Sequence, residues 1–248
     1  KGGLMVVFLD PRTGRAVWAG AAEAVVKERP SSDLVQKRLA YAITEMFKQE
    51  GFKLLGWGDA GFGRVFSKSP IMKPQDYRNV RPWVPREDPA MPEMMKIAGA
   101  NGIPLGIPEV LPALQTGMVD TVLASAVVAV ALQWFRHTTH MSADSNTAII
   151  GATLIKQEIF DSIPPDAQEA LTETGIKAHK KLIQVVQKED HAAYLTLKKR
   201  GMIEFDPLKD PKDAAEWEKL NKELLKRLTG RLWPKALYDK VTALAAKG

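Results

Sequence analysis

The 248-residue sequence contains no cysteine and only four histidines. The lack of cysteine excludes disulfides, thiolate metal ligands and cysteine nucleophiles. No apolar run reaches the ~20 residues that a membrane-spanning helix needs, because the longest one, Met118–Leu132, is interrupted by Asp120. The chain begins at Lys1 without an initiator methionine or an apolar signal core, so we expect that a targeting peptide has been removed or omitted.

A strong excess of one charge sign is also missing. The sequence is 45% hydrophobic and 26% charged, and its formal net charge is +6, which is ordinary for a globular protein. The lysines of 177–200 and 209–247 alternate with acidic residues on expected helices, and no aromatic residues are interleaved with them. This pattern is typical of a solvated surface, so we expect no nucleic-acid partner.

The sequence offers few candidates for catalysis, a cofactor or a metal. A G-x-G-x-x-G motif spans residues 56–61, but the residues after it lack the helical period that a dinucleotide site requires. A glycine-flanked aromatic loop explains these residues better. His137 and His140 would share a face only on a helix, and their surroundings favour an extended chain. No serine lies in a G-x-S-x-G elbow. We therefore expect no enzyme activity, no cofactor and no metal.

Strands and helices alternate through the middle of the chain, which predicts an α/β fold with a mixed or parallel sheet. The N-terminus reads as a β-hairpin around the turn at 10–14, and the stretch from Gly56 to Pro92 shows almost no helical period. The predicted strands are 52–57, 103–107, 118–124, 148–155 and 202–205. The predicted helices begin near 33, 92, 108, 125, 165, 213 and 234, and the helix from Pro165 to Arg200 is the longest.

Aromatic residues are unusually informative here. Trp57, Phe62, Phe66 and Trp83 lie in the irregular stretch, and Trp134 lies at a helix end. Each one alone could equally fill the core of a lobe. As a set, they indicate a mostly apolar cleft.

Several motifs follow one another in an order that resembles the TRAP-transporter solute-binding proteins of the DctP type. These motifs are Gly51–Trp57, Gly61-Phe62, Ser69–Ile71, Pro74–Asp76, Gly99–Leu105, Glu109, Ala113–Asp120 and Ile163–Asp166. The resemblance covers roughly residues 48–248, and the block Ala113–Asp120 is its most specific part. It implies a periplasmic-binding-protein-like fold of two α/β lobes with mixed sheets and a long C-terminal helix. It also implies a periplasmic receptor that delivers a small ligand to a TRAP-type membrane permease.

Two departures from the family concern the ligand. Trp83 stands where the family has an arginine that clamps a carboxylate, and Arg81 would project on the same face of an extended chain. Ala124 replaces a family asparagine. Both changes remove polarity, so we expect a more apolar ligand stacked on Trp83, whereas Arg81 in the cleft would favour an organic acid. The candidate ligand-binding residues are Trp57, Phe62, Arg81, Trp83, Ala124, Ser125, Gln133 and Trp134. Of these, Ser125 or Gln133 would hold the polar end of the ligand, and we expect Asp120 to be structural.

The N-terminal residues 1–47, a β-hairpin plus a helix, are atypical of the family, so we expect the first lobe to be incomplete. Residues 48–248 form the part that is similar to the TRAP solute-binding proteins. An alternative function follows from this division: a structural or interaction module of the cell envelope that keeps the binding-protein lobe without transport. An enzyme is the third alternative, and it depends only on the glycine motif.

Overall fold

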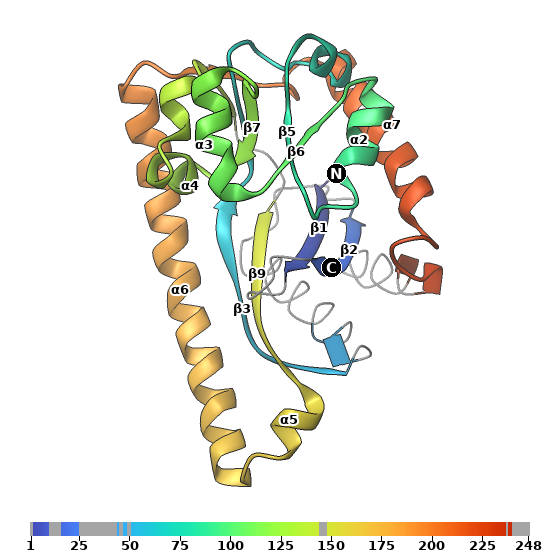
Figure 1. Ribbon diagram of the computed structural model, residues 1–248, viewed down its shortest axis with the longest axis vertical. Helices are drawn as coiled ribbons and strands as arrows, with labels where there is room; N and C mark the ends of the chain where they lie inside the picture. Colours follow the sequence, from blue (N-terminus) through green and yellow to red (C-terminus); the bar gives the residue numbers. More distant parts are fainter. Residues whose placement is uncertain are drawn as a thin grey trace.

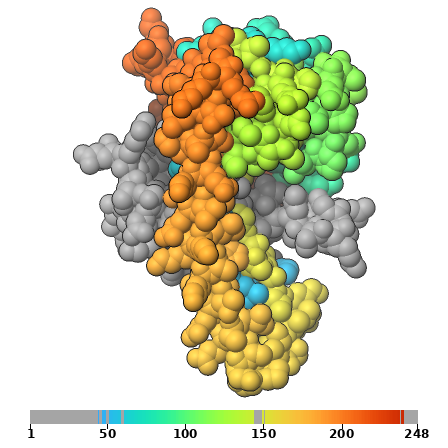
Figure 2. All heavy atoms as spheres, turned by 90° about the vertical axis from the view of Figure 1, so that its left-hand side faces the viewer, coloured from blue at the N-terminus to red at the C-terminus, as the bar shows by residue number. Residues whose placement is uncertain are grey.

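A long helix and two strands beside it run along the long axis of the molecule (Figure 1). The computed structural model describes residues 2–9, 16–24, 44, 47–48, 51–143, 148–236 and 238–239. Helix α6 (Pro165–Lys199) has 35 residues, which is roughly 50 Å at 1.5 Å per residue. Strand β3 (Phe52–Phe62) pairs antiparallel with β9 (Ala148–Lys156). In Figure 2, α6 runs along one side of the molecule, where most of its residues are exposed.

Glycines allow β3 and α6 to pack closely. A Cβ atom at Gly56 would collide with the His179 ring, and one at Gly175 would collide with the Leu55 carbonyl oxygen. The G-x-G-x-x-G motif therefore lies inside a strand, and its first glycine serves helix packing. The expectation of a glycine-flanked loop after Trp57 was wrong, because β3 continues to Phe62.

Short strands in mixed orientation build the part at the top of Figure 1. They are β4 (Arg64–Ser67), β5 (Trp83–Pro85), β6 (Ile103–Leu105), β7 (Thr121–Ala124), β8 (His140–Ser142) and β10 (Ile203–Phe205). One sheet has the order β10-β8-β4-β7, in which β10 and β8 are parallel and the other pairs are antiparallel. Strands β5 and β6 form a separate parallel pair. This is the mixed α/β architecture that the sequence predicted.

Helices cover these strands. They are α2 (Met91–Ala98), α3 (Ile107–Thr116), α4 (Ala126–Ala131) and α7 (Pro211–Leu228), with 3-10 turns η1 (Pro74–Asn79) and η2 (Trp134–His137). Helix α5 (Gln157–Asp161) lies at the bottom of Figure 1, beside β9 and β3. Local sequence explains several of their ends. Pro108 lies in the first turn of α3, and Gly117 ends α3 with a φ of 72°. No described helix has the length and apolar character required to cross a membrane.

Two hydrophobic cores lie on opposite faces of the four-stranded sheet. Phe66 and Val122 belong to the core that also contains Leu197 of α6. Val65 and Leu123, their neighbours along the strands, pack on the second core with α2 and α7. The alternation follows from the two-residue repeat of a strand. The sheet is therefore covered on both faces.

At the N-terminus, strand β1 (Gly2–Leu9) pairs antiparallel with β2 (Ala16–Ala24). Most of the helix expected after Pro30 lies outside the described residues, as does most of the helix expected from Pro234. The stretch from Gly56 to Pro92 was expected to be irregular, and this was wrong. It contains the end of β3 and the elements β4, η1 and β5, whose strands are too short to produce a clear sequence period.

Candidate functional site

Three of the predicted ligand-binding residues meet where β3, β7 and α4 come together. Ala124 ends β7 and lies opposite Arg64 in the register of β4 and β7. Ser125 follows as the N-cap residue of α4, and a Cβ atom at Gly61 would lie 2.9 Å from the Cβ of Ser125. Phe62 ends β3 and is 44% exposed. We call the region formed by Phe62, Arg64, Ala124, Ser125 and Asp190 the β3–α4 junction.

A buried carboxylate from the long helix holds the β3–α4 junction together. Asp190 is 4% exposed. Its Oδ1 accepts the Val127 N–H at 3.0 Å, and its Oδ2 accepts the Phe62 N–H at 3.4 Å. Gly61 has a φ of 92°, and a Cβ atom there would lie 2.7 Å from the Asp190 carboxyl carbon, so the site requires glycine. One side chain of α6 thus fixes the end of β3 and the first turn of α4.

Sequence analysis missed Asp190 because it interpreted the charges of this helix as a solvated face. A signal was present, however. The buried residues of α6 are Ile183, Asp190 and Leu197, which are seven residues apart and therefore share one helix face. An acidic residue at the centre of an apolar stripe is a candidate for a buried, hydrogen-bonded role.

Arg64 is a second functional candidate that sequence analysis missed. Its side chain is buried at 3% exposure, and its Nη1 donates to the Ser142 carbonyl at 3.1 Å. The guanidinium carbon lies 4.2 Å from the centroid of the Tyr194 ring. A guanidinium is charged at any physiological pH, and burial strengthens its interaction with an anion. The only sequence signal was one arginine in the otherwise uncharged strand Arg64–Ser67.

The Tyr194 ring beneath Arg64 is itself held in place. The Tyr194 hydroxyl donates to Glu204, and the Lys198 ammonium donates to both groups at 3.3 Å. Desolvation, together with the nearby Glu204 carboxylate, raises the pKa of Tyr194 above its usual value. The hydroxyl is therefore protonated at neutral pH.

Ser125 contributes an available hydrogen-bonding group to the β3–α4 junction. The residue is fully buried, and its Oγ has no hydrogen-bond partner among the described residues. Buried hydroxyls almost always find a partner, because leaving one without costs roughly 1–3 kcal/mol. The Ser125 hydroxyl is thus suited to bind a ligand.

The structure places Trp83 and Trp134 in the first core. Trp83 is 6% exposed, and its indole N–H donates to the Leu105 carbonyl at 3.0 Å. The two indole rings meet edge to face, with centroids 5.3 Å apart. Trp83 therefore stabilises the packing of β5 and β6 against η2, whereas the sequence predicted that it would form the wall of a cleft.

Arg81 also lies apart from the β3–α4 junction. Its exposed guanidinium pairs with Asp120, with Nη2 and Oδ2 3.1 Å apart. The Oδ1 of Asp120 accepts the Arg81 backbone N–H at 2.7 Å. Asp120 thus has the structural contacts expected of it, and it neutralises the arginine that was the sequence-based candidate for a carboxylate clamp.

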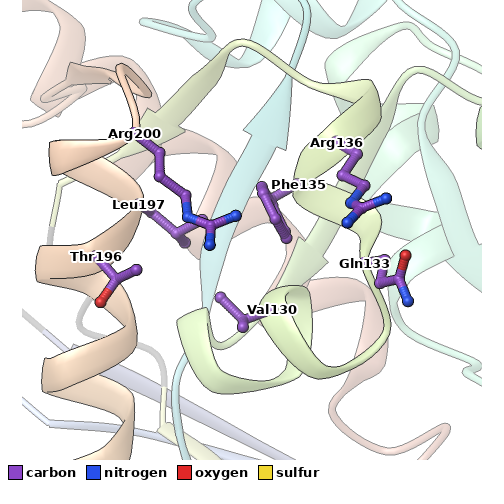
Figure 3. Close-up of a pocket in the computed structure, with 7 residues that line it drawn as sticks. All are labelled: Val130, Gln133, Phe135, Arg136, Thr196, Leu197 and Arg200. Carbon is purple, nitrogen blue, oxygen red and sulfur yellow. The ribbon is translucent and has the colours of Figure 1, made fainter.

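The remaining predicted residues lie elsewhere. Trp57 is half-buried in β3, opposite Ala152 of β9. Gln133 lines a cavity beside α6 (Figure 3). His137 ends η2 and His140 begins β8, and the described part of the chain holds no group of three side chains suited to a metal ion. The predicted set thus divides among the junction, the first core, the β3–β9 strand pair and this cavity, and Arg81 lies apart in its ion pair with Asp120.

Residues 29–231 match the family described as bacterial extracellular solute-binding protein, family 7. A solute-binding protein from Albidiferax ferrireducens is 21% identical over 168 residues, which cover 66% of this chain and 49% of that protein. The chain thus spans about half the length of this curated relative. The family match begins at residue 29, within the N-terminal segment that the sequence set apart.

Solved structures have the same fold. A TRAP periplasmic solute-binding protein from Ralstonia eutropha with bound 2-acetolactate aligns with a TM-score of 0.75 at 19% identity, over 88% of this chain and 72% of that one. A protein of the same description from Desulfovibrio salexigens with bound orotic acid gives 0.71 at 20% identity, over the same shares. Together with the match over residues 29–231, these likenesses identify the chain as a member of the bacterial extracellular solute-binding proteins, family 7.

Proposed function

We propose that the protein is a periplasmic solute-binding receptor that delivers an organic acid to a TRAP-type membrane permease. The family and its solved members are extracellular or periplasmic binding proteins, and the family is one of transport proteins. The observation that carries the choice of ligand is the β3–α4 junction. There, the buried Arg64 guanidinium and the Ser125 hydroxyl, which has no partner in the described part of the chain, come from adjacent strand ends.

Carboxylate recognition fits these two groups. A guanidinium presents N–H donors in a planar fork that matches the two oxygens of a carboxylate, and a hydroxyl can add a third hydrogen bond. The Tyr194 ring supports the guanidinium from one face. Arg64 and Ser125 would therefore bind the carboxylate, and Phe62 would cover the rest of the ligand.

The more apolar ligand that the sequence favours has less support. It required the Trp83 indole as a wall, but this indole is buried and its N–H is bonded to Leu105. Solved relatives of similar fold hold 2-acetolactate, malonate and orotic acid, all of which are organic acids. We therefore favour an organic acid for this chain as well.

Thermal unfolding tests the proposal. The full chain is heated with malonate, 2-acetolactate or orotate, and the neutral diamide of malonate is the matched control for charge. A bound acid at one hundred times its Kd stabilises the fold by ~2.7 kcal/mol, and the diamide should have no effect.

Variants then locate the binding site. Ser125→Ala should weaken the effect of the acid while keeping the fold, because its hydroxyl has no hydrogen-bond partner among the residues that the structure describes. Arg64→Gln should remove the part of the stabilisation that comes from acid bound at the β3–α4 junction, and Arg78→Gln, at an exposed arginine, is the control. If no acid stabilises the protein, the envelope interaction module becomes the better account. Equal loss in Arg78→Gln would contradict the assignment of Arg64.

A further inference from the structure

A second group of cationic side chains surrounds a cavity of about 210 Å³ beside the C-terminal end of α6 (Figure 3). The apolar side chains of Val130 and Leu197 line it together with Phe135, Arg136 and Arg200. We call it the α6–η2 cavity. Arg200 lies ten residues after Asp190, roughly 15 Å further along the helix axis, so the cavity is separate from the β3–α4 junction.

The two arginines of the α6–η2 cavity lack an acidic partner among the described residues. By contrast, four exposed arginines elsewhere pair with carboxylates: Arg81 with Asp120, Arg86 with Glu109, Arg227 with Glu223 and Arg231 with Glu93. A fifth exposed arginine, Arg78, donates to the Ala98 carbonyl. Two cations beside one cavity repel each other unless an anion lies between them. The electrostatic potential in the cavity is therefore positive, and a bound anion would reduce the repulsion between the two guanidiniums.

Phe135 organises the two cations. The guanidinium carbon of Arg200 lies 5.5 Å from the centroid of the Phe135 ring, and Figure 3 shows this ring between Arg200 and Arg136. A guanidinium that rests its face on a ring keeps its edge donors available for an anion. The ring also offers an apolar surface for the carbon part of a ligand.

The backbone of Gln133, at the same cavity, is strained. Its φ of 60° is the only positive value among the described non-glycine residues. This left-handed conformation costs roughly 1–2 kcal/mol in a residue other than glycine, and such strain is concentrated at functional sites. The unusual backbone places the Gln133 amide at the edge of the cavity, on the same side as Arg136 (Figure 3).

We propose that the α6–η2 cavity is a second anion site, which binds a small carboxylate between Arg136 and Arg200. The carboxylate oxygens accept from the two guanidiniums, and the carbon part of the ligand lies on Phe135. The volume is below the range of about 300–1,000 Å³ that is usual for drug-sized ligands, so the site suits an acid of a few carbons. This inference does not depend on the proposed transport function.

Nuclear magnetic resonance locates the binding directly. Malonate is titrated into the isotope-labelled full chain at constant ionic strength, and the backbone amides of Gln133, Phe135 and Arg200 are followed. We expect saturable shifts at these amides, separate from any shifts at Phe62 and Ser125. The neutral diamide of malonate should leave them unchanged, because it has no charge for the two guanidiniums to bind.

Matched variants decide the assignment. Arg136→Gln and Arg200→Gln should each weaken malonate binding at these amides by at least about tenfold, since each removes a charge-assisted contact. Lys199→Gln removes the same charge one residue away and should have no effect. Both arginines are exposed, so the variants should fold, and thermal unfolding checks this. The absence of shifts at the cavity, or equal weakening in Lys199→Gln, would overturn the proposal. Each group of amides reports binding at its own site, so the proposal for one site can be contradicted without the other.

Discussion

The β3–α4 junction and the α6–η2 cavity are both proposed to bind an anion through arginine, but the arginines of the two sites have opposite surroundings. Arg64 is buried, bonded to a backbone carbonyl and supported by Tyr194. Arg136 and Arg200 are exposed, and one aromatic ring lies between them. Burial strengthens electrostatic attraction and removes screening by salt, whereas exposure leaves the attraction weak and adjustable. The comparison indicates that an arginine side chain would hold an anion rigidly where it is buried, and weakly and adjustably where it is exposed.

The largest effect is expected from removing the carboxylate that fixes the junction. Asp190→Ala leaves the part-buried N–H groups of Phe62 and Val127 without their acceptor. Each such loss costs roughly 1–3 kcal/mol, so the free energy of unfolding should fall by about 2–4 kcal/mol. Urea denaturation measures this fall. Glu189→Ala, at the exposed neighbouring residue, is the control, and a similar fall there would remove the special role of Asp190.

Alkaline pH should weaken the support beneath Arg64. The pKa of Tyr194 is raised in the folded protein by burial first and by the Glu204 hydrogen bond next. A raised pKa means that this contribution to stability is complete below the unfolded pKa of about 10 and is lost as pH rises through the folded value. Stability should therefore decline above about pH 10. Tyr194→Phe should decline less steeply, and an identical pH profile in this variant would contradict the interpretation.

Salt concentration should affect acid binding differently at the two arginine sites. Raising sodium chloride from about 0.1 M to about 1 M shortens the screening length from roughly 10 Å to roughly 3 Å. Malonate binding at the α6–η2 cavity should weaken several-fold over this range, because both guanidiniums are exposed. Acid binding at the β3–α4 junction should change much less. If acid binding depends equally on salt at both groups of amides, the burial of Arg64 does not distinguish the two sites.

The smallest effect concerns the strained backbone of the cavity. Gln133→Gly removes the cost of a side chain at φ 60°, but it adds freedom to the unfolded chain. We expect a small net gain in stability, ~0.5 kcal/mol, in denaturant unfolding. Gln133→Ala keeps the strain and should show no gain. A loss of more than ~1 kcal/mol in the glycine variant would mean that the amide itself stabilises the fold.

The order of elements could be predicted because it depends on local signals. The expected helix from Pro165 to Arg200 differs from α6 by a single residue, since a proline in the first turn and the following Gly201 mark its ends. The strands from Gly56 to Pro92 were missed because β4 and β5 have only four and three residues. No periodicity is visible over such lengths.

The site was harder to predict because burial is a property of the whole fold. Phe62, Ala124 and Ser125 were expected near one another, and the structure brings them together. Trp83 was expected beside them, but tertiary packing against Trp134 places it in the core. Arg64 and Asp190 were overlooked because a single charged residue looks like surface until its neighbours in space are known.

The glycine contacts between β3 and α6 have a mechanical consequence. A helix that meets a two-stranded ribbon almost backbone to backbone resists bending more than either element does alone, because few flexible side chains separate them. The pairing of β3 with β9 loses its regular register between Asp59 and Phe62, beside the positive φ of Gly61 and the anchor at Asp190. We therefore expect the helix and the two strands to resist bending together, and to bend most easily at this irregularity.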